Sequence, residues 1–197
     1  MTRTEIINHL IKRGEYKSYL EIGVNTPAQP GYNWTGVEVE TKHGVDPNVD
    51  TTYKMPSDEF FESHISQKYD IVFVDGLHLF EQAHRDIINS LKHLNDGGII
   101  VAHDCNPVEE ITQRRERASD AWHGDVWKAI VKLRIQNPEL SVVTVEADEG
   151  CGLIWRGGQQ LLNFGADDDP YEYSFLEKNR VDALNLITPD TFLKMFP

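Results

Sequence analysis

Polar side chains that could perform acid–base chemistry or bind a ligand follow four short apolar segments of the chain. The segments are Tyr19 to Val24, Gly44 to Val45, Ile71 to Val74 and Ile99 to Ala102. The residues at their ends are Glu21, Gly23, Asn25, Asp46, Asp75, His78, His103 and Asp104. In an open parallel sheet, ligands bind beyond the carboxyl ends of the strands, near the point where the strand order reverses. We therefore expect these side chains to converge on one crevice.

The first of these ends combines an acid with a glycine. Gly23 permits close approach of a ligand to the backbone. Glu21 lies within an apolar segment, and a buried acid needs a partner such as a backbone amide or a ligand amine. Glu21 could instead cap the following loop. Only one glycine of the G-x-G-x-x-G fingerprint is present, so the sequence does not favour a phosphate cradle.

Asp46 follows Gly23 by 23 residues. An acid at this spacing, at the end of the second strand, can accept hydrogen bonds from both ribose hydroxyls of a nucleoside. Asp46 and Pro47 could also form an ordinary Asp-Pro turn. If the second strand lies elsewhere, Glu38 or Glu40 takes the place of Asp46.

Asp75 and Asp104 end two successive strands, which usually lie side by side. Two neighbouring carboxylates could share a hard divalent cation such as Mg²⁺, or form a hydrogen-bonded pair without metal. His78 could act as a general base because imidazole titrates near neutral pH, and His103 could do the same. For Cys105 the sequence does not favour a nucleophile over simple packing.

Strands alternate with helices along the chain. We predict helices over 4–12, 57–67, 80–94 and 126–136, with Ser57 as an N-cap, and a helical tail over 171–196. A loop is expected over 25–33, further β-prone segments over 37–39, 140–145 and 152–155, and a turn over 95–98. Nearly pure apolar strands indicate a mostly parallel sheet in an α/β fold with helices on both faces. The last two strands are expected to form an antiparallel hairpin at one edge.

Bulk composition limits the possible partners. The chain has 197 residues, a net charge of −13 and a pI near 4.9. We expect one domain over 1–197, with an N-terminal helix in 1–18 and a helical C-terminal tail over 159–197. The acidic surface argues against nucleic acid and membranes, and we interpret the basic stretch Arg114, Arg115 and Arg117 as a solvated face. No apolar run approaches a membrane span, so a cytoplasmic location is the default expectation.

A dense aromatic and polar cluster lies between the third and fourth helices. Trp122, His123 and Asp125 could form a loop that closes over the site and stacks on a substrate. Trp127 is expected to pack in the core instead.

The segments YLEIGV, GVDPN, SDEFF, DIVFVDGLHLFEQAHRDI and GGIIVAHDCNP resemble class I methyltransferases of the Methyltransf_24 type over Tyr19 to Trp155. The resemblance implies a Rossmann-like methyltransferase sheet with an antiparallel edge strand and S-adenosylmethionine bound at the first two strand ends. Glu21 and Gly23 match the first motif, and Asp46 matches the ribose-binding acid. Asp75 and His78 match a DGxH motif, and His103 and Asp104 match an HD pair.

Related O-methyltransferases bind magnesium through acids at the two latter strand ends and a following Asp or Asn. Cys105 stands at that following position here, and Asn106 could substitute. The segment Pro27 to Glu40 is irregular for the helix usually found there.

The resemblance implies O-methylation of a small polar acceptor, for example a sugar hydroxyl. The alternatives are an NAD-dependent oxidoreductase, a non-catalytic nucleoside- or sugar-binding module of the same fold, and a metal-dependent hydroxylase. The tail from Tyr171 carries enough apolar surface to dock on the domain or on a second copy in a homo-oligomer.

Overall fold

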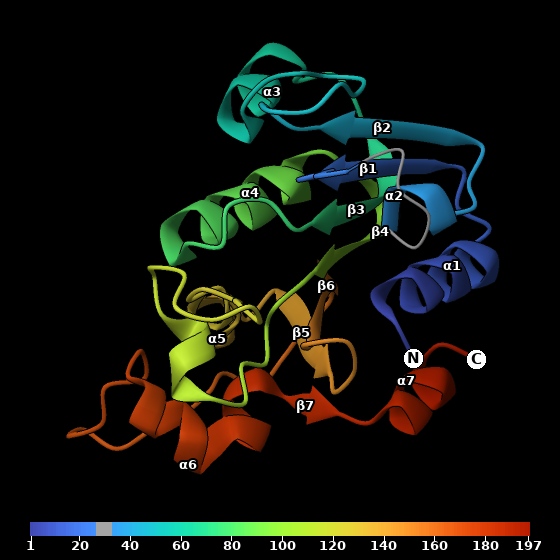
Figure 1. Ribbon diagram of the computed structural model, residues 1–197. Coiled ribbons are helices and arrows are strands. Elements are labelled where there is room, and N and C mark those ends of the chain that lie inside the picture. Colours follow the sequence, from blue (N-terminus) through green and yellow to red (C-terminus); the bar gives the residue numbers. More distant parts are fainter. Residues whose placement is uncertain (27–32) are drawn as a thin grey trace.

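A computed structural model describes residues 1–26 and 33–197, and its centre is a seven-stranded sheet (Figure 1). The strands follow the order β2-β1-β3-β4-β6-β5-β7. Their bounds are Ser18–Ile22 (β1), Thr41–Val45 (β2), Tyr69–Val74 (β3), Leu94–Ala102 (β4), Leu140–Val145 (β5), Cys151–Arg156 (β6) and Leu186–Ile187 (β7). Strands β2, β1, β3 and β4 are parallel to their neighbours, β6 is antiparallel to β4 and β5, and β7 is parallel to β5.

Helices cover both faces of the sheet because its strands alternate two sets of apolar side chains. In β3, Val72 and Val74 join one hydrophobic core, and Ile71 and Phe73 join the other. The first core contains side chains of α3, α4, α5 and α6, and the second contains those of α1 and α7. The helices are Arg3–Gly14 (α1), Asn33–Gly36 (α2), Ser57–Ser63 (α3), Phe80–Lys92 (α4), Trp127–Gln136 (α5), Tyr173–Leu184 (α6) and Pro189–Met195 (α7), with a 3-10 helix over Glu110–Gln113. The predicted α/β class with a mostly parallel, doubly covered sheet is confirmed.

The strand order reverses between β1 and β3, and the sheet is tightly bonded there. Backbone hydrogen bonds continue to the carboxyl rim: Gly23 N donates to Val45 O, Asp75 N to Ile22 O and His103 N to Val74 O, at 2.9, 2.9 and 3.0 Å. Gly23 has φ +87°, and a Cβ on it would lie 2.2 Å from the Asp75 carbonyl oxygen. Glycine is required here both for the left-handed backbone and for the space.

Several predicted elements differ from the observed ones. Val37–Val39 is not a strand, because Glu38 N donates to the Asn8 side chain of α1 instead of to a neighbouring strand. Residues 95–98, for which the sequence predicts a turn, belong to β4, and the β3–β4 register shifts at this point. The predicted loop over 25–33 lies mostly outside the described residues.

Two helices are shorter than predicted. Helix α3 ends at Ser63 instead of Gln67, since the Ser63 hydroxyl donates to the Glu59 carbonyl at 2.6 Å and competes with the helical bond. Its N-cap is Pro56, not Ser57. The tail is interrupted at Asn185, whose φ of 48° ends α6 and lets Leu186–Ile187 add to β5.

The predicted hairpin of the last two long strands is present as β5–β6, and β7 extends this edge. Across residues 1–26 and 33–197, no helix has both the length and the apolar character needed to cross a bilayer.

We predict that Gly23→Ala lowers the free energy of unfolding by about 3 kcal/mol or more, because it combines a left-handed backbone with overpacking. Gly97→Ala is the matched control: Gly97 has φ +77°, but no atom lies within 4 Å of the position that a Cβ would take. It should cost only about 1–2 kcal/mol, from the backbone alone. Urea denaturation of both variants measures the difference, and equal losses would contradict the close approach at the rim.

Candidate active site

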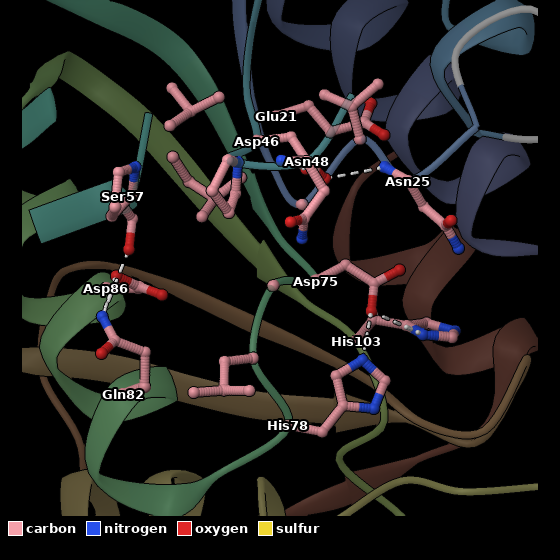
Figure 2. A pocket seen from close by; sticks show the side chains of 18 of the residues that line it. Glu21, Asn25, Asp46, Asn48, Ser57, Asp75, His78, Gln82, Asp86 and His103 are labelled. Atoms are coloured by element: carbon pink, nitrogen blue, oxygen red, sulfur yellow. Dashed lines mark hydrogen bonds and ion pairs between the residues drawn. The ribbon is translucent and has the colours of Figure 1, made fainter. Parts of the chain in front are cut away.

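One pocket of about 610 Å³ lies at the carboxyl rim of the sheet (Figure 2). All eight residues expected to converge contribute to its lining: Glu21, Gly23, Asn25, Asp46, Asp75, His78, His103 and Asp104. They come from the ends of β1, β2, β3 and β4, which are neighbours in the sheet. The sequence-based expectation of one shared crevice therefore agrees with the geometry. Glu38 and Glu40 line a different depression beside α1, which removes them as replacements for Asp46.

Glu21 is 2% exposed, and it shares the α1 face of the sheet with Tyr19. The Tyr19 hydroxyl and the Asn33 amide donate to its Oε2 at 2.5 and 3.1 Å. Oε1 receives no hydrogen bond among the described residues. Burial raises the pKa of Glu21 to about 7 against these two stabilising bonds. The carboxyl group is thus partly protonated at neutral pH, and a cationic ligand group would favour its ionised form.

Asp46 serves as a local turn residue as well as a pocket residue. Its Oδ2 accepts from Asn25 N at 3.0 Å, and its Oδ1 accepts from Asn48 N and Val49 N at 2.8 and 3.2 Å. A carboxylate offers about four acceptor positions. With three of them used by the backbone, Asp46 has room for one ribose hydroxyl instead of the expected two. The Asn48 side chain lies close to Asp46 at the pocket (Figure 2) and is a second candidate partner.

Asp75, His78, His103 and Asp104 form a compact charged group at the tips of β3 and β4, and Figure 2 shows the first three of them. Asp75 Oδ1 lies 3.4 Å from His78 Nε2 and 3.4 Å from His103 Nδ1. Asp104 lies 3.1 Å from His78 Nδ1 and 3.3 Å from His103 Nδ1. The two imidazoles therefore alternate with the two carboxylates.

This arrangement sets the charge of each group. Burial alone would raise the pKa of Asp75, but the charges and hydrogen bonds of His103 and His78 hold it well below its usual range. Burial alone would lower the pKa of both histidines. The surrounding carboxylates outweigh burial, so the pKa of His78 is raised and that of His103 is raised further. Each imidazole thus lies among carboxylates that favour its charged form, and both histidines favour the charged form of Asp75.

The Asp104 tip has a constrained backbone. Asp104 has φ 58°, an uncommon value for a residue with a side chain. The following residues are bonded to the loop between β5 and β6: Cys105 N donates to Gly150 O at 3.0 Å and Asn106 N to Glu149 O at 2.9 Å. A conformation that costs energy at a pocket residue persists only where neighbouring structure enforces it, as this loop does.

The residues present fit a divalent cation. Asp75, His78 and Asp104 each present one ligand atom, and these atoms lie within 4.8 Å of one another. The carboxylates suit Mg²⁺, and an imidazole nitrogen also suits transition metals. Asn106 is not a substitute ligand, because its amide oxygen accepts from Arg180 at 2.7 Å, outside the pocket lining. Cys105 is fully buried and its pKa is raised by burial, so it packs instead of reacting.

Comparisons with known proteins agree with this geometry. A family model described as a methyltransferase domain, Methyltransf_24, matches residues 9–105. This match spans β1 to β4 and every strand end described above. The predicted resemblance to class I methyltransferases of the Methyltransf_24 type is therefore confirmed over residues 9–105.

Solved structures share the fold of this methyltransferase domain. A Podospora anserina methyltransferase bound to S-adenosylhomocysteine is 15% identical, with a TM-score of 0.57 over 79% of this chain and 78% of that one. A Bacillus cereus O-methyltransferase in complex with S-adenosylhomocysteine is 14% identical, with a TM-score of 0.51 over 78% and 80%. A methyltransferase of the mycinamycin biosynthetic pathway, with magnesium and S-adenosylhomocysteine, is 15% identical, with a TM-score of 0.50 over 87% and 52%. No curated protein matches the chain. Neither the oxidoreductase nor the binding-module interpretation gains support.

The pocket of the methyltransferase domain also contains residues that sequence reasoning missed. At the end farthest from His103 in Figure 2 lie Ser57, Gln82 and Asp86. Asp86 is 1% exposed, accepts from Gln82 at 3.0 Å, and has a pKa raised by burial to about 6. Asp86 lies three residues after Ala83 on the buried face of α4. An acid at helical spacing within an apolar face could therefore have indicated a pocket residue from the sequence. Arg3 gave no such signal, since only the fold brings it to the pocket.

The cluster at Trp122 contacts the site without lining the pocket. The Trp122 ring stacks on His78 at 5.0 Å between centroids, and its carbonyl lies 3.2 Å from His78 Nδ1. Asp125 accepts from Phe80 N and from Arg115, both at 2.7 Å, so it caps α4. Trp127 is fully buried, as predicted. The loop thus holds the His78 ring in its orientation through the Trp122 ring and carbonyl.

We predict that Glu21 makes the protein less stable as pH rises. A carboxyl group whose folded pKa of about 7 exceeds its unfolded value of 4.5 stabilises the fold fully below pH 4.5, and this contribution is lost between pH 4.5 and 7. The full loss is up to about 3 kcal/mol. Glu21→Gln should therefore show a flatter decline of unfolding free energy over this window than the wild type. Glu40→Gln, at an exposed acid, should follow the wild type; parallel curves for all three proteins would contradict the prediction.

Proposed function

We propose that the protein is an S-adenosylmethionine-dependent methyltransferase that methylates a hydroxyl group of a small polar acceptor, such as a sugar. The observation that carries this proposal is the single pocket into which four neighbouring strand ends bring an acid, a glycine turn and a histidine–carboxylate group. A volume of about 610 Å³ lies in the usual range for small-molecule sites. The S-adenosylhomocysteine-bound structures of the same fold supply the donor class.

The donor fits the pocket in one direction. Asp46 and Asn48 bind the ribose in this orientation, and Glu21 offers the α-amino group its Oε1, to which no described residue donates a hydrogen bond. Gly23 lines the pocket at the end of β1, beside the amino-acid part of the donor in this orientation. The methyl group then faces the tips of β3 and β4, where the acid–base groups lie.

Methyl transfer is an in-line displacement at a sulfonium carbon. The acceptor oxygen forms a bond to the methyl carbon, the carbon–sulfur bond breaks, and its electron pair stays on sulfur. Because the donor is already activated, alignment of donor and acceptor supplies most of the acceleration. The acceptor hydroxyl must also lose its proton as the new bond forms.

We propose that a histidine at the tips of β3 and β4 accepts that proton. The His78 side chain is 21% exposed and His103 is 7% exposed, so His78 is the more accessible base. Its Nδ1 faces two acceptors, the Trp122 carbonyl and Asp104, and keeps its proton. Nε2 faces Asp75 Oδ1, and His78 acts as the base in the form that has lost the Nε2 proton, so that Nε2 can take the one from the acceptor hydroxyl. Asp75 and Asp104 hold the ring in this orientation, and His103 is the second candidate.

The two carboxylates are also the proposed magnesium ligands. A bound cation would stabilise the developing alkoxide of the acceptor. If His78 is also a ligand of the cation, His103 would accept the proton of the acceptor hydroxyl instead.

Calorimetry with S-adenosylhomocysteine tests the donor. We expect binding of this product, and no binding of NAD. Measuring acceptor turnover with and without Mg²⁺, in the wild type and in Asp104→Asn, tests the metal: Mg²⁺ should increase turnover of the wild type only. Absence of S-adenosylhomocysteine binding would end the methyltransferase proposal, and equal turnover with and without Mg²⁺ would end the metal assignment.

His78→Gln should lower kcat about 10²- to 10⁴-fold, the usual contribution of general acid–base catalysis, while the affinity for S-adenosylhomocysteine changes little. His84→Ala is the control, since His84 is a nearby histidine of α4 outside the pocket lining, and it should leave kcat unchanged. Assays on a panel of sugar and other hydroxyl acceptors give kcat, and calorimetry gives Kd separately. An unchanged kcat in His78→Gln would exclude this residue as the base.

A further inference from the structure

The pocket has a strong imbalance of charge. Its lining carboxylates are Glu21, Asp46, Asp58, Asp75, Asp86 and Asp104. Among the described lining residues, Arg3 is the only arginine or lysine. Arg3 is thus the permanent cation that an anionic group meets in this pocket among the described lining residues, since the charges of His78 and His103 already face carboxylates. The proposed donor carries one such group, the α-carboxylate of its methionine part.

Arg3 is held firmly at the first turn of α1. Thr2 caps this helix through a capping box with Glu5. The Arg3 backbone N donates to Asp148 Oδ2 at 2.6 Å, and its Nη1 lies 3.3 Å from both Asp148 carboxylate oxygens. The same Nη1 lies 3.4 Å from His103 Nε2. The guanidinium is thus positioned in the pocket wall beside His103.

One edge of this guanidinium is left for a ligand. All three side-chain contacts of Arg3 use Nη1. Nε is buried and has no hydrogen-bond partner among the described residues, and no contact to Nη2 is found within them either. Nε and Nη2 form the edge that binds a carboxylate side-on through two parallel hydrogen bonds. A buried unpaired donor is costly, and a ligand carboxylate that displaces the groups covering Nε would satisfy it.

Glu21 lies close to the same turn of α1. Thr4, the residue after Arg3, donates to the Asn33 side chain at 2.9 Å, and Asn33 donates to Glu21 at 3.1 Å. One network thus joins the helix turn that carries the cation to the acid expected to bind the donor amine. An amino acid zwitterion needs this pairing of one cation and one anion.

We propose that Arg3 binds the α-carboxylate of the methyl donor, opposite Glu21, and so selects donors that carry the complete amino-acid part. This inference rests on the proposed function. Arg3 lies before residue 9, where the family match begins, so it is a feature of this chain outside the matched domain.

The experiment compares two ligands that differ only in the carboxylate: S-adenosylhomocysteine and its decarboxylated analogue. In Arg3→Met, the Kd for S-adenosylhomocysteine should rise about 10- to 100-fold, as expected for a lost charge-assisted pair. The Kd for the decarboxylated analogue should change less than about threefold, since the contact it lacks is the one removed. Arg3→Lys should retain part of the selectivity because it keeps the charge without the side-on edge.

Arg13→Met is the matched control, with the same substitution at an exposed arginine of the last turn of α1, and both ligands should bind to it as to the wild type. Thermal unfolding checks that each variant is folded. Equal losses for the two ligands in Arg3→Met would show that Arg3 acts only through Asp148 and His103, and no loss would show that it does not contact the donor. If the wild type itself fails to bind S-adenosylhomocysteine, the proposed function fails instead, and this outcome is distinct from both.

Discussion

The hydrogen bonds that continue the sheet to its carboxyl rim determine where the pocket residues at the strand ends lie. Gly23 is bonded to the end of β2, Asp75 to the end of β1, and His103 to the end of β3. Each bond places the first residue beyond a strand in register with the next strand, so side chains far apart in sequence reach one pocket. This depends on a bare α-carbon at Gly23, because the Asp75 carbonyl occupies the space where a side chain would begin.

The rim gathers acids, and their repulsion has to be offset within the protein. Asp75 and Asp104 are separated by two imidazoles, and Asp148 faces His103 and the Arg3 guanidinium. The raised pKa of both histidines and the lowered pKa of Asp75 follow from this alternation. Glu21 lacks a cationic neighbour at hydrogen-bond distance among the described residues, and its pKa rises instead. The pocket is therefore balanced at the ends of β3 and β4 and incompletely balanced at Glu21, where a cationic ligand group would supply the missing charge.

Residues at strand ends could be predicted from sequence because their signal is local. Asp75 and Asp104 each follow a run of apolar residues, and parallel strands place such residues on one edge of the sheet. The same reasoning gave the hairpin of β5 and β6. It failed for Val37–Val39, where a helix side chain satisfied the backbone, and for the tail, where Asn185 interrupts the helical pattern. The positions of Arg3 and Asp148 beside His103 were not predictable from local sequence. Arg3 contacts His103 and Asp148, which lie 100 and 145 positions away along the chain. The two roles considered for Asp46, turn residue and ligand acceptor, are not exclusive in the structure.

The chain beyond the family match contributes to the geometry within it. The HD pair after β4 belongs to the matched region, but the two residues that follow it, Cys105 and Asn106, are bonded through their backbone to Gly150 and Glu149, which lie beyond the match. Gly150 has φ +88°, and a Cβ there would lie 2.4 Å from Asn106, so the two loops are in close contact. Arg180 of α6 adds two hydrogen bonds of 2.7 Å, to the Asn106 side chain and the Pro107 carbonyl. The left-handed backbone of Asp104 is thus fixed from two sides by segments that carry no recognised motif. A family pattern can identify Asp104 as a site residue. The orientation of its carboxylate toward His78 depends on segments in the C-terminal third of the chain.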